Sequence, residues 1–179
     1  MEQTLLRRAV AGDHVAAGSL LADYETALFR LCEGVLRHPD DAADAVQETF
    51  LRVLRGISRF RGEARFKTWI YRVALNVCLE WKRSRRPVEP LDQRHHEIPV
   101  HGPGLEVQTV DRMRIQEALS VLLPRHRAVL LLKERDGWSV AEIADAFGWN
   151  EKRVHNELYC ARRTLAEWRM RSEREGVEP

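Results

Sequence analysis

The sequence has few of the residues that build cross-linked or membrane-spanning proteins. Only three of its 179 residues are cysteines, Cys32, Cys78 and Cys160, and they lie far apart along the chain. An odd number of separated cysteines argues against a disulfide framework and a zinc cluster, and it fits a reducing cytoplasm. No apolar run approaches the roughly 20 residues of a transmembrane helix. The N-terminus is interrupted by Arg7 and Arg8, so we expect no secretory signal.

The sustained alternation of apolar and polar residues that indicates a β-strand is also missing. Proline is concentrated in one place, since four of the seven prolines fall between residues 87 and 103. Helical periodicity covers the residues before this segment and those after it. We therefore predict an all-α fold with two small helical domains, residues 1–86 and 114–179, joined by a flexible linker, residues 87–113.

The small net charge of +2 hides an uneven distribution of charged residues. Residues 52–86 carry 11 basic and 2 acidic side chains, whereas residues 1–51 carry 4 basic and 9 acidic ones. The basic block is a candidate surface for a polyanion. An ordinary solvated helix face would give the same count.

Residues 139–168 have the pattern of a helix-turn-helix. Ser139 and Glu142 have the spacing of a capping box, Gly148 suits the end of the first helix, and Asn150 can cap the second. Apolar residues at spacings of four and three then form one stripe on the second helix. Its members are Val154, Leu158, Ala161, Leu165 and Trp168. The pattern predicts DNA binding, although any helical hairpin with a glycine turn shares part of it.

The face of the second helix opposite that stripe is polar and basic. Asparagine and arginine read adenine and guanine edges, and basic neighbours bind phosphates. Glu157 is unusual on such a surface. It can pair with Arg153, four residues earlier, or accept from a cytosine amino group. The predicted DNA-binding residues are Lys152, Arg153, His155, Asn156, Tyr159 and Arg163.

In the first domain, residues 40–57 are predicted to form one helix. Its inward stripe contains Val46, Phe50, Val53 and Ile57. A second face carries Asp44, Gln47, Glu48 and Leu51, where an outward leucine beside polar side chains suggests a docking surface. Complementation of the helix dipole is the simpler explanation for the acids.

Residues 60–69 form an expected loop that mixes aromatic and basic side chains, and a helix is expected to continue from Ile70. Such a mixture suits unstacked bases and a phosphate backbone. Phe60, Phe66 and Trp69 would equally suit a hydrophobic core. The candidate single-strand contacts are Arg61, Lys67, Arg72, Asn76 and Arg83.

Several stretches together resemble the sigma-70 family of bacterial transcription initiation factors, in its extracytoplasmic-function group. They are Asp44-Ala-Val-Gln-Glu-Thr-Phe, Phe60-Arg-Gly-Glu, Thr68-Trp-Ile-Tyr-Arg-Val-Ala-Leu-Asn76 and Leu122-Leu-Pro-Arg-His-Arg, with the helix-turn-helix after it. The resemblance covers nearly all of the chain outside the predicted linker. Two departures are His38, where the family usually has aspartate, and a second helix less basic than is usual.

The resemblance implies a role for each group of residues. Asp44, Gln47, Glu48 and Leu51 would bind the clamp helices of RNA polymerase core. The basic loop and the helix after it would read the minus-ten element of promoter DNA and hold a flipped base, and the last helix would read the minus-thirty-five element. The resemblance also implies an anti-sigma factor as a further partner, two domains able to fold against each other in the free chain, and no cofactor, metal or catalysis.

Two other classes of protein stay open from the residues alone. A regulator of the response-regulator type would share the helix-turn-helix and would bind duplex DNA without polymerase. A metal protein or enzyme would have to use His95, His96 and His101 with the cysteines. These histidines lie in the Pro/Gly-rich segment, without carboxylates at helical spacing to orient them.

Overall fold

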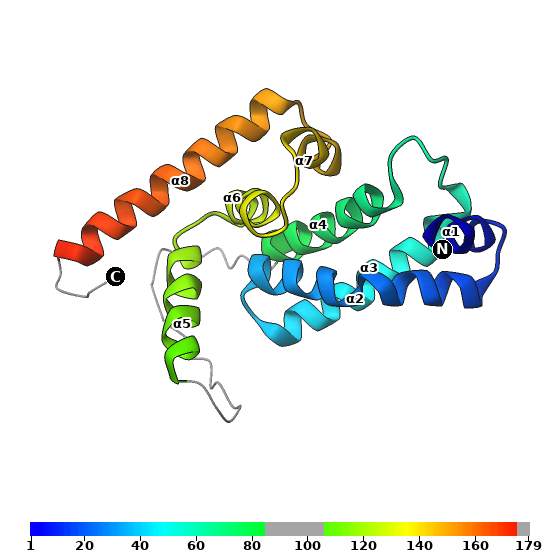
Figure 1. Cartoon of the computed structure of the whole chain (residues 1–179), viewed down its shortest axis with the longest axis horizontal. Helices are drawn as coiled ribbons and strands as arrows, with labels where there is room; N and C mark the ends of the chain where they lie inside the picture. The colour runs from blue at the N-terminus through cyan, green and yellow to red at the C-terminus, as the bar shows by residue number, and fades with distance from the viewer. Residues whose placement is uncertain (85–105, 175–179) are drawn as a thin grey trace.

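The computed structural model describes residues 1–84 and 106–174, and all regular structure in these residues is helical. This confirms the predicted all-α class. We call residues 1–84 the N-terminal module and residues 106–174 the C-terminal module (Figure 1). The first contains α1 (Glu2–Val10), α2 (His14–Leu36), α3 (Pro39–Gly56), the short 3-10 helix η1 (Ile57–Arg59) and α4 (Phe66–Ser84). The second contains α5 (Glu106–Ser120), α6 (Pro124–Leu130), the π-helical turn η2 (Leu131–Arg135), α7 (Val140–Phe147) and α8 (Glu151–Arg174).

Local chemistry explains where α2 begins and ends. Gly12 takes a φ of +96°, which a residue without a Cβ adopts readily. The Asp13 carboxylate then accepts hydrogen bonds from the backbone N–H groups of Val15 and Ala16, both at 3.0 Å. At the other end, Arg37 takes a left-handed conformation with φ of 64°. Pro39 follows and starts α3, because its missing N–H is no loss at the first turn of a helix.

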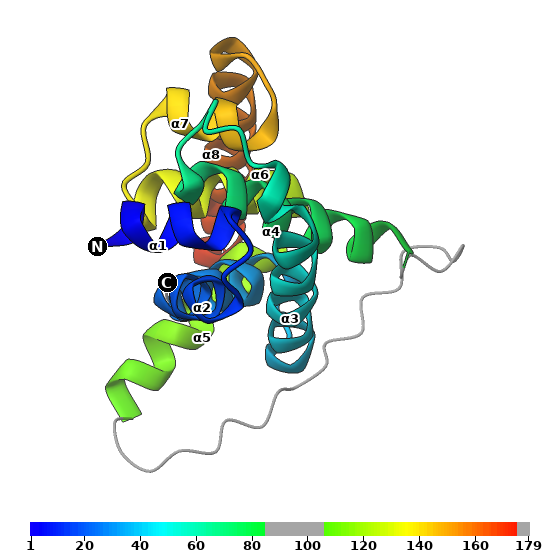
Figure 2. The same ribbon diagram turned by 90° about the vertical axis from the view of Figure 1, so that its right-hand side faces the viewer.

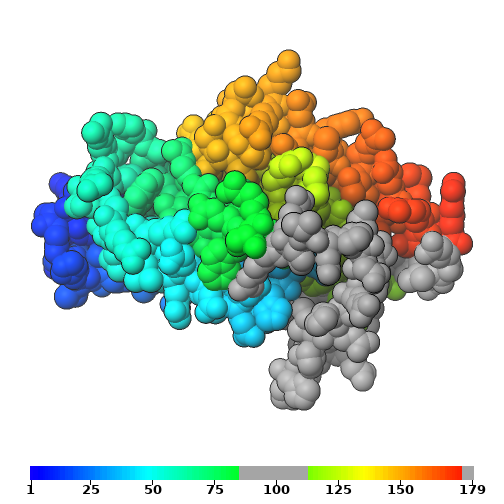
Figure 3. Space-filling model, turned by 180° about the vertical axis from the view of Figure 1, so that it is seen from behind, coloured from blue at the N-terminus to red at the C-terminus, as the bar shows by residue number. Residues whose placement is uncertain are grey.

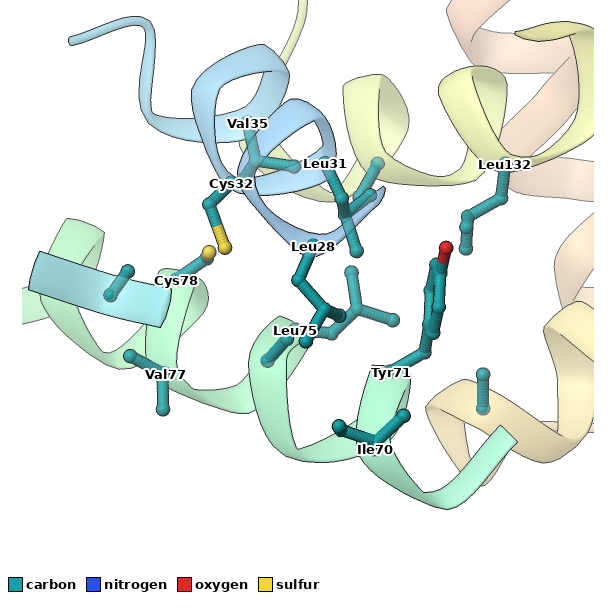
Figure 4. Packing of buried hydrophobic residues seen from close by; sticks show 14 of the residues in the cluster. Leu28, Leu31, Cys32, Val35, Ile70, Tyr71, Leu75, Val77, Cys78 and Leu132 are labelled. Atoms are coloured by element: carbon teal, nitrogen blue, oxygen red, sulfur yellow. The ribbon is translucent and has the colours of Figure 1, made fainter. Parts of the chain in front are cut away.

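The core of the N-terminal module lies where α2, α3 and α4 pack together (Figure 4). Leu28 and Leu31 of α2 and Ile70 and Leu75 of α4 are almost completely buried. The inward stripe predicted for residues 40–57 is confirmed, with Val46, Val53 and Ile57 buried and Phe50 packed against them. The helix thereby leaves its polar face outside.

Two predicted boundaries differ from the structure. Helix α4 begins at Phe66, four residues before the expected start at Ile70, because Phe66 and Thr68 are already buried against the module. Helix α5 begins at Glu106, inside the predicted linker. No proline or glycine follows Gly104 until Pro124, so nothing in that stretch opposes a helix.

The rest of the predicted linker, residues 87–105, lies outside the described residues, as do His95, His96 and His101. Among the helices that are described, none combines the length and the apolar character needed to cross a bilayer.

The two modules pack against each other, with α6 beside α2 and α7 beside α4 (Figures 1 and 2). Arg127 of α6 is buried, and its Nη1 donates to the carbonyl oxygen of Val35, near the end of α2, at 2.7 Å. Its other nitrogens donate to the carbonyls of Leu119 and Leu122, at 2.7 and 2.8 Å. Burial lowers the pKa of Arg127 to about 10, which leaves the side chain charged at neutral pH. One cation therefore ties the end of α2 to the C-terminal module.

Gly34 allows α2 to approach η2 closely. A Cβ atom at this position would lie 2.5 Å from Cδ1 of Leu131, well inside van der Waals contact. A second arginine, Arg135, donates from Nη1 to the carbonyl oxygen of Arg30 at 3.0 Å. In the space-filling view the two modules adjoin as one body (Figure 3).

Candidate functional site

The helix-turn-helix of α7 and α8 has the local geometry that its sequence predicts. The Ser139 hydroxyl accepts from the N–H of Glu142 at 3.2 Å, and the Glu142 carboxylate accepts from the N–H of Ser139 at 2.9 Å. The second bond lowers the pKa of Glu142. Gly148 ends α7 with φ of 66°, and the Asn150 side chain accepts from the N–H of Arg153 at 2.8 Å. The turn between the two helices is thus fixed at both ends.

Helix α8 separates a buried stripe from an exposed polar face. Val154, Leu158 and Ala161 are buried, and Leu165 and Trp168 are half-buried. All six residues predicted to bind DNA from this helix are exposed: Lys152, Arg153, His155, Asn156, Tyr159 and Arg163. Arg153 also lies over the Trp149 ring, 4.1 Å from its centroid, and Arg163 pairs with Glu167 at 2.8 Å. The six side chains are therefore accessible on the side of α8 away from its buried stripe.

Glu157 points inward, so its suggested reach to a cytosine is not supported. Its side chain is only 13% exposed, and its Oε2 atom lies 3.0 Å from both Arg125 Nε and His126 Nε2. The expected pairing with Arg153 is present at 3.8 Å. Burial is the main effect on His126 and lowers its pKa, while the nearby Glu157 carboxylate opposes that shift. Local sequence patterns cannot indicate Arg125 and His126 as partners, because these residues lie on another helix, α6.

The outer face of α3 presents most of the residues predicted to dock a partner. Asp44 and Gln47 are exposed, and Leu51 is 48% exposed. Leu54, which the sequence interpretation did not include, adds a second exposed apolar side chain one turn later. Glu48 is half-buried and bonds Arg52 at 2.7 Å, which in turn bonds Glu80 of α4 at 2.8 Å. Glu48 therefore also holds α3 to α4.

The aromatic residues around the start of α4 pack on one another. Phe66 is buried, and its ring lies 5.6 to 5.8 Å, between centroids, from the rings of Tyr24, Phe60 and Trp69. Edge-on and tilted pairs at these distances stabilise a core. Of the two interpretations of these aromatics, the core interpretation holds for Phe66.

The predicted minus-ten residues divide into two groups. Arg61, Asn76 and Arg83 are exposed. Lys67 and Arg72 contact the C-terminal module. Lys67 is exposed, but its ammonium lies 4.8 Å from the Trp138 ring centroid, and the half-buried Arg72 donates to the carbonyl oxygen of Asp145 in α7. The placement of these two follows from the packing of the modules, which sequence periodicity cannot show.

The same contact continues as a hydrophobic junction. The rings of Tyr71 and Trp138 are 4.7 Å apart between centroids, and both residues are buried. Burial raises the pKa of Tyr71 to about 12, so its hydroxyl stays protonated. Tyr71 also points towards Leu132 of the C-terminal module (Figure 4). Arg72, one of the residues expected to bind DNA, is therefore half-buried and engaged with the C-terminal module in this arrangement.

The cysteines do not form the cluster that a metal protein would need. Cys32 and Cys78 are buried, with their sulfur atoms turned towards each other (Figure 4), and Cys160 is exposed. In the part of the chain that the structure describes, no group of three or more histidine, cysteine, aspartate or glutamate residues could hold a metal ion.

Comparison with known proteins finds relatives for both modules of the chain. Two family models match the chain, sigma-70 region 2 over residues 20–88 and sigma-70 region 4 over residues 112–165. The chain is 32% identical over 164 residues to the ECF RNA polymerase sigma factor SigM of Mycobacterium tuberculosis, covering 90% of this chain and 81% of that protein. It is 28% identical over 176 residues to the ECF RNA polymerase sigma-E factor of Haemophilus influenzae, covering 92% and 93%.

Two solved structures have a similar fold. CnrH in complex with the cytosolic domain of CnrY has a TM-score of 0.71 and 24% identity, covering 93% of this chain and 96% of that one. The sigma factor RpoE in complex with the anti-sigma factor NepR from Bartonella quintana has a TM-score of 0.63 and 20% identity, covering 84% and 94%.

Proposed function

Because this chain belongs to the extracytoplasmic-function group of the sigma-70 family, we propose that it binds bacterial RNA polymerase core and directs it to promoters. The observation that supports this most is the exposed face of α8, where Lys152, Asn156 and Arg163 stand clear of the protein core. In this proposal the face lies in the major groove at the minus-thirty-five element. Polar side chains there read base edges, and the cations bind phosphates.

The N-terminal module supplies the polymerase contact and the contact with melted DNA. The exposed α3 residues Asp44, Gln47 and Leu51 dock on the clamp helices of the largest core subunit, with Glu48 at the edge of that face. Arg61, Lys67, Arg72, Asn76 and Arg83 bind the minus-ten element. Promoter opening follows when a base leaves the stack and is held by the protein, which offsets an unstacking free energy of a few kcal/mol.

The chain acts by binding and positioning, without a reaction of its own. Core polymerase holds the two modules at the spacing of the two promoter elements, so the second DNA contact gains from a high effective concentration. The packed arrangement of the modules is then a closed form, since Lys67 and Arg72 are engaged with the C-terminal module. Polymerase must bind the chain in an open form, with the modules separated. The fraction of chains in this open form therefore limits the apparent affinity of the chain for polymerase.

An anti-sigma factor is the expected regulator of this step. The similarly folded RpoE of Bartonella quintana was solved with an anti-sigma factor bound. By analogy, a protein that binds the packed modules of this chain would keep it from polymerase. The proposal is that such a partner selects the closed form.

The experiment that tests the proposed function is transcription in vitro with bacterial core enzyme on a library of promoter sequences. Selective start sites that appear only when the purified chain is added are the expected result. A chain that binds duplex DNA tightly by itself and directs no start sites would support a response-regulator type of protein instead.

The docking face is tested by measuring the affinity of the purified chain for core polymerase. Asp44→Arg combined with Gln47→Ala should weaken core binding by at least tenfold, because both residues lie exposed on one face of α3. Asp23→Arg is the matched control, a charge reversal at an exposed position of α2. Equal core affinity for the double variant and the control would show that α3 is not the docking face.

A further inference from the structure

A group of charged residues joins α6 to α8 beside the predicted DNA-binding face. Its centre is the carboxylate of Glu157, whose Oε2 accepts from Arg125 Nε at 3.0 Å and lies 3.0 Å from His126 Nε2. Arg153 Nε lies 3.8 Å from the other carboxylate oxygen. A carboxylate with only 13% of its side chain exposed is unfavourable unless such partners surround it. The group is therefore a built part of the fold.

Arg125 and Arg153 are each held by contacts on one side of the guanidinium group and have N–H donors available on the other. Among the described residues, Arg125 donates through Nε only, which leaves its two terminal amino groups for another acceptor. Its side chain is 49% exposed. Arg153 is 54% exposed and is supported from below by Trp149, which stacks on Phe147 at 4.2 Å between centroids. Each guanidinium thus has a fixed base and free donors.

Fixed guanidinium groups with free amino groups suit a phosphodiester. The planar group of arginine presents parallel N–H donors that match two phosphate oxygens. Holding the side chain in advance reduces the conformational entropy lost when the phosphate binds. Because Glu157 is turned inward and its two oxygens face the cations Arg125 and Arg153, its own repulsion of a phosphate is weakened.

We infer that Arg125 is a further DNA-contacting residue, and that Glu157 is a positioning residue that holds Arg125 and Arg153 towards the phosphate backbone. This inference rests on the proposed function, because the DNA is the duplex that α8 reads. It adds a contact from α6, outside the helix-turn-helix. Phosphate contacts of this kind fix the register of the protein on DNA and carry no sequence information.

The test is the affinity of the holoenzyme, assembled from the full chain and bacterial core, for a duplex that carries its promoter, measured over a range of salt concentrations. Arg125→Ala should lower affinity about tenfold and reduce the slope of log affinity against log salt by about 1, equally for different minus-thirty-five sequences. Arg169→Ala is the matched control, an exposed arginine on α8 that pairs with Glu173 far from this group. It should change neither quantity.

Glu157 variants separate positioning from simple repulsion. If the carboxylate only repels DNA, Glu157→Ala must bind more tightly than the unaltered chain. If it positions the arginines, the same variant binds several-fold more weakly, Glu157→Gln recovers most of the loss by accepting from Arg125, and Arg125→Ala adds little to Glu157→Ala. Thermal unfolding of each variant shows whether the fold is intact.

The outcomes distinguish this inference from the proposed function. A holoenzyme that does not assemble, or directs no start sites, contradicts the proposed function whatever the variants do. A holoenzyme that initiates selectively while Arg125→Ala keeps the original affinity and salt slope overturns the role of Arg125 alone. Tighter binding of Glu157→Ala overturns the positioning role.

Discussion

The three cysteines occupy two different environments. Cys32 and Cys78 are completely buried between α2 and α4, and Cys160 is exposed on α8. The hydrogen bond with Cys32, together with burial, raises the pKa of the Cys78 thiol well above its usual value. Because the thiolate is the reactive form, both the missing access and the raised pKa protect the buried pair.

We therefore expect one fast-reacting thiol in the native protein. An aromatic disulfide reagent at pH 8 should titrate Cys160 within seconds to minutes, and the other two only as the N-terminal module unfolds. In denaturant all three thiols should react, and Cys160→Ser should remove the fast phase. Two or more fast thiols in the native chain would contradict the packing of Cys32 and Cys78.

Asn76 is the exposed polar residue of α4 best placed to test base capture. It carries no charge, so its removal should have little effect on the long-range attraction that forms the initial complex with duplex DNA. Asn76→Ala should slow promoter opening about tenfold, as expected for one lost base contact, with closed-complex affinity nearly unchanged. Permanganate reactivity of melted thymines measures opening, and retention on DNA at low temperature measures the closed complex. Equal losses in both steps would contradict a role in base capture.

At the scale of a single helix, α7 depends on its N-terminal cap. The Ser139 hydroxyl satisfies the N–H of Glu142, which has no partner within the helix. Ser139→Ala should lower the free energy of unfolding by about 1 kcal/mol, as measured by urea denaturation of the full chain. Ser19→Ala is the control, since Ser19 is exposed inside α2 and bonds only the carbonyl of Val15. The Ser19→Ala change should be neutral or slightly stabilising. Equal losses of unfolding free energy in the two variants would show that the Ser139 cap contributes nothing.

The helices themselves were largely predictable from local patterns. The capping box at Ser139, the left-handed Gly148 and the inward stripe of α3 depend on residues within a few positions of one another, so the sequence contains them in full. The start of α4 was placed four residues late because the burial of Phe66 depends on Tyr24, a residue of another helix. Boundaries set by tertiary packing carry no local signal.

Contacts between distant helices account for what the sequence did not show about the candidate site. Glu157 was recognised as unusual, but its partners Arg125 and His126 lie about thirty positions away. Lys67 was expected in the loop and Arg72 in the helix after it, whereas both lie in α4. Their engagement with Trp138 and α7 depends on how the modules meet. The exposed face of α8 was predictable because the helical period alone determines it.

For the whole molecule, the junction of the modules combines apolar packing with arginine-to-backbone hydrogen bonds. Arg127, Arg135 and Arg72 each donate to a backbone carbonyl of the other module. Water can replace such bonds when the modules separate, so much of their enthalpy is recovered in the open form. The Tyr71 and Trp138 pair supplies part of the apolar packing at the junction. An interface of this composition suits an arrangement that opens and closes.

Gly34 offers a way to open the junction without touching any predicted DNA or polymerase contact. A Cβ there meets Leu131 at 2.5 Å, and rotation of the flexible Leu131 side chain could accommodate alanine, so a larger residue is needed. Gly34→Leu should separate α2 from η2. Gly18→Leu is the matched control, because Gly18 lies in the same helix with open space around it. Both changes alter helix propensity equally, so only the first affects the junction.

The separation can be measured by energy transfer between labels on Cys160 and on Ser19→Cys, two exposed positions in different modules. Gly34→Leu should lower transfer and, because less free energy is then needed to open the chain, raise its apparent affinity for core several-fold. The Gly18→Leu chain should match the unaltered one in both measurements. If Gly34→Leu opened the chain and left core affinity unchanged, the packed form would not compete with polymerase binding. The contacts of Lys67 and Arg72 with the C-terminal module would then have no regulatory consequence.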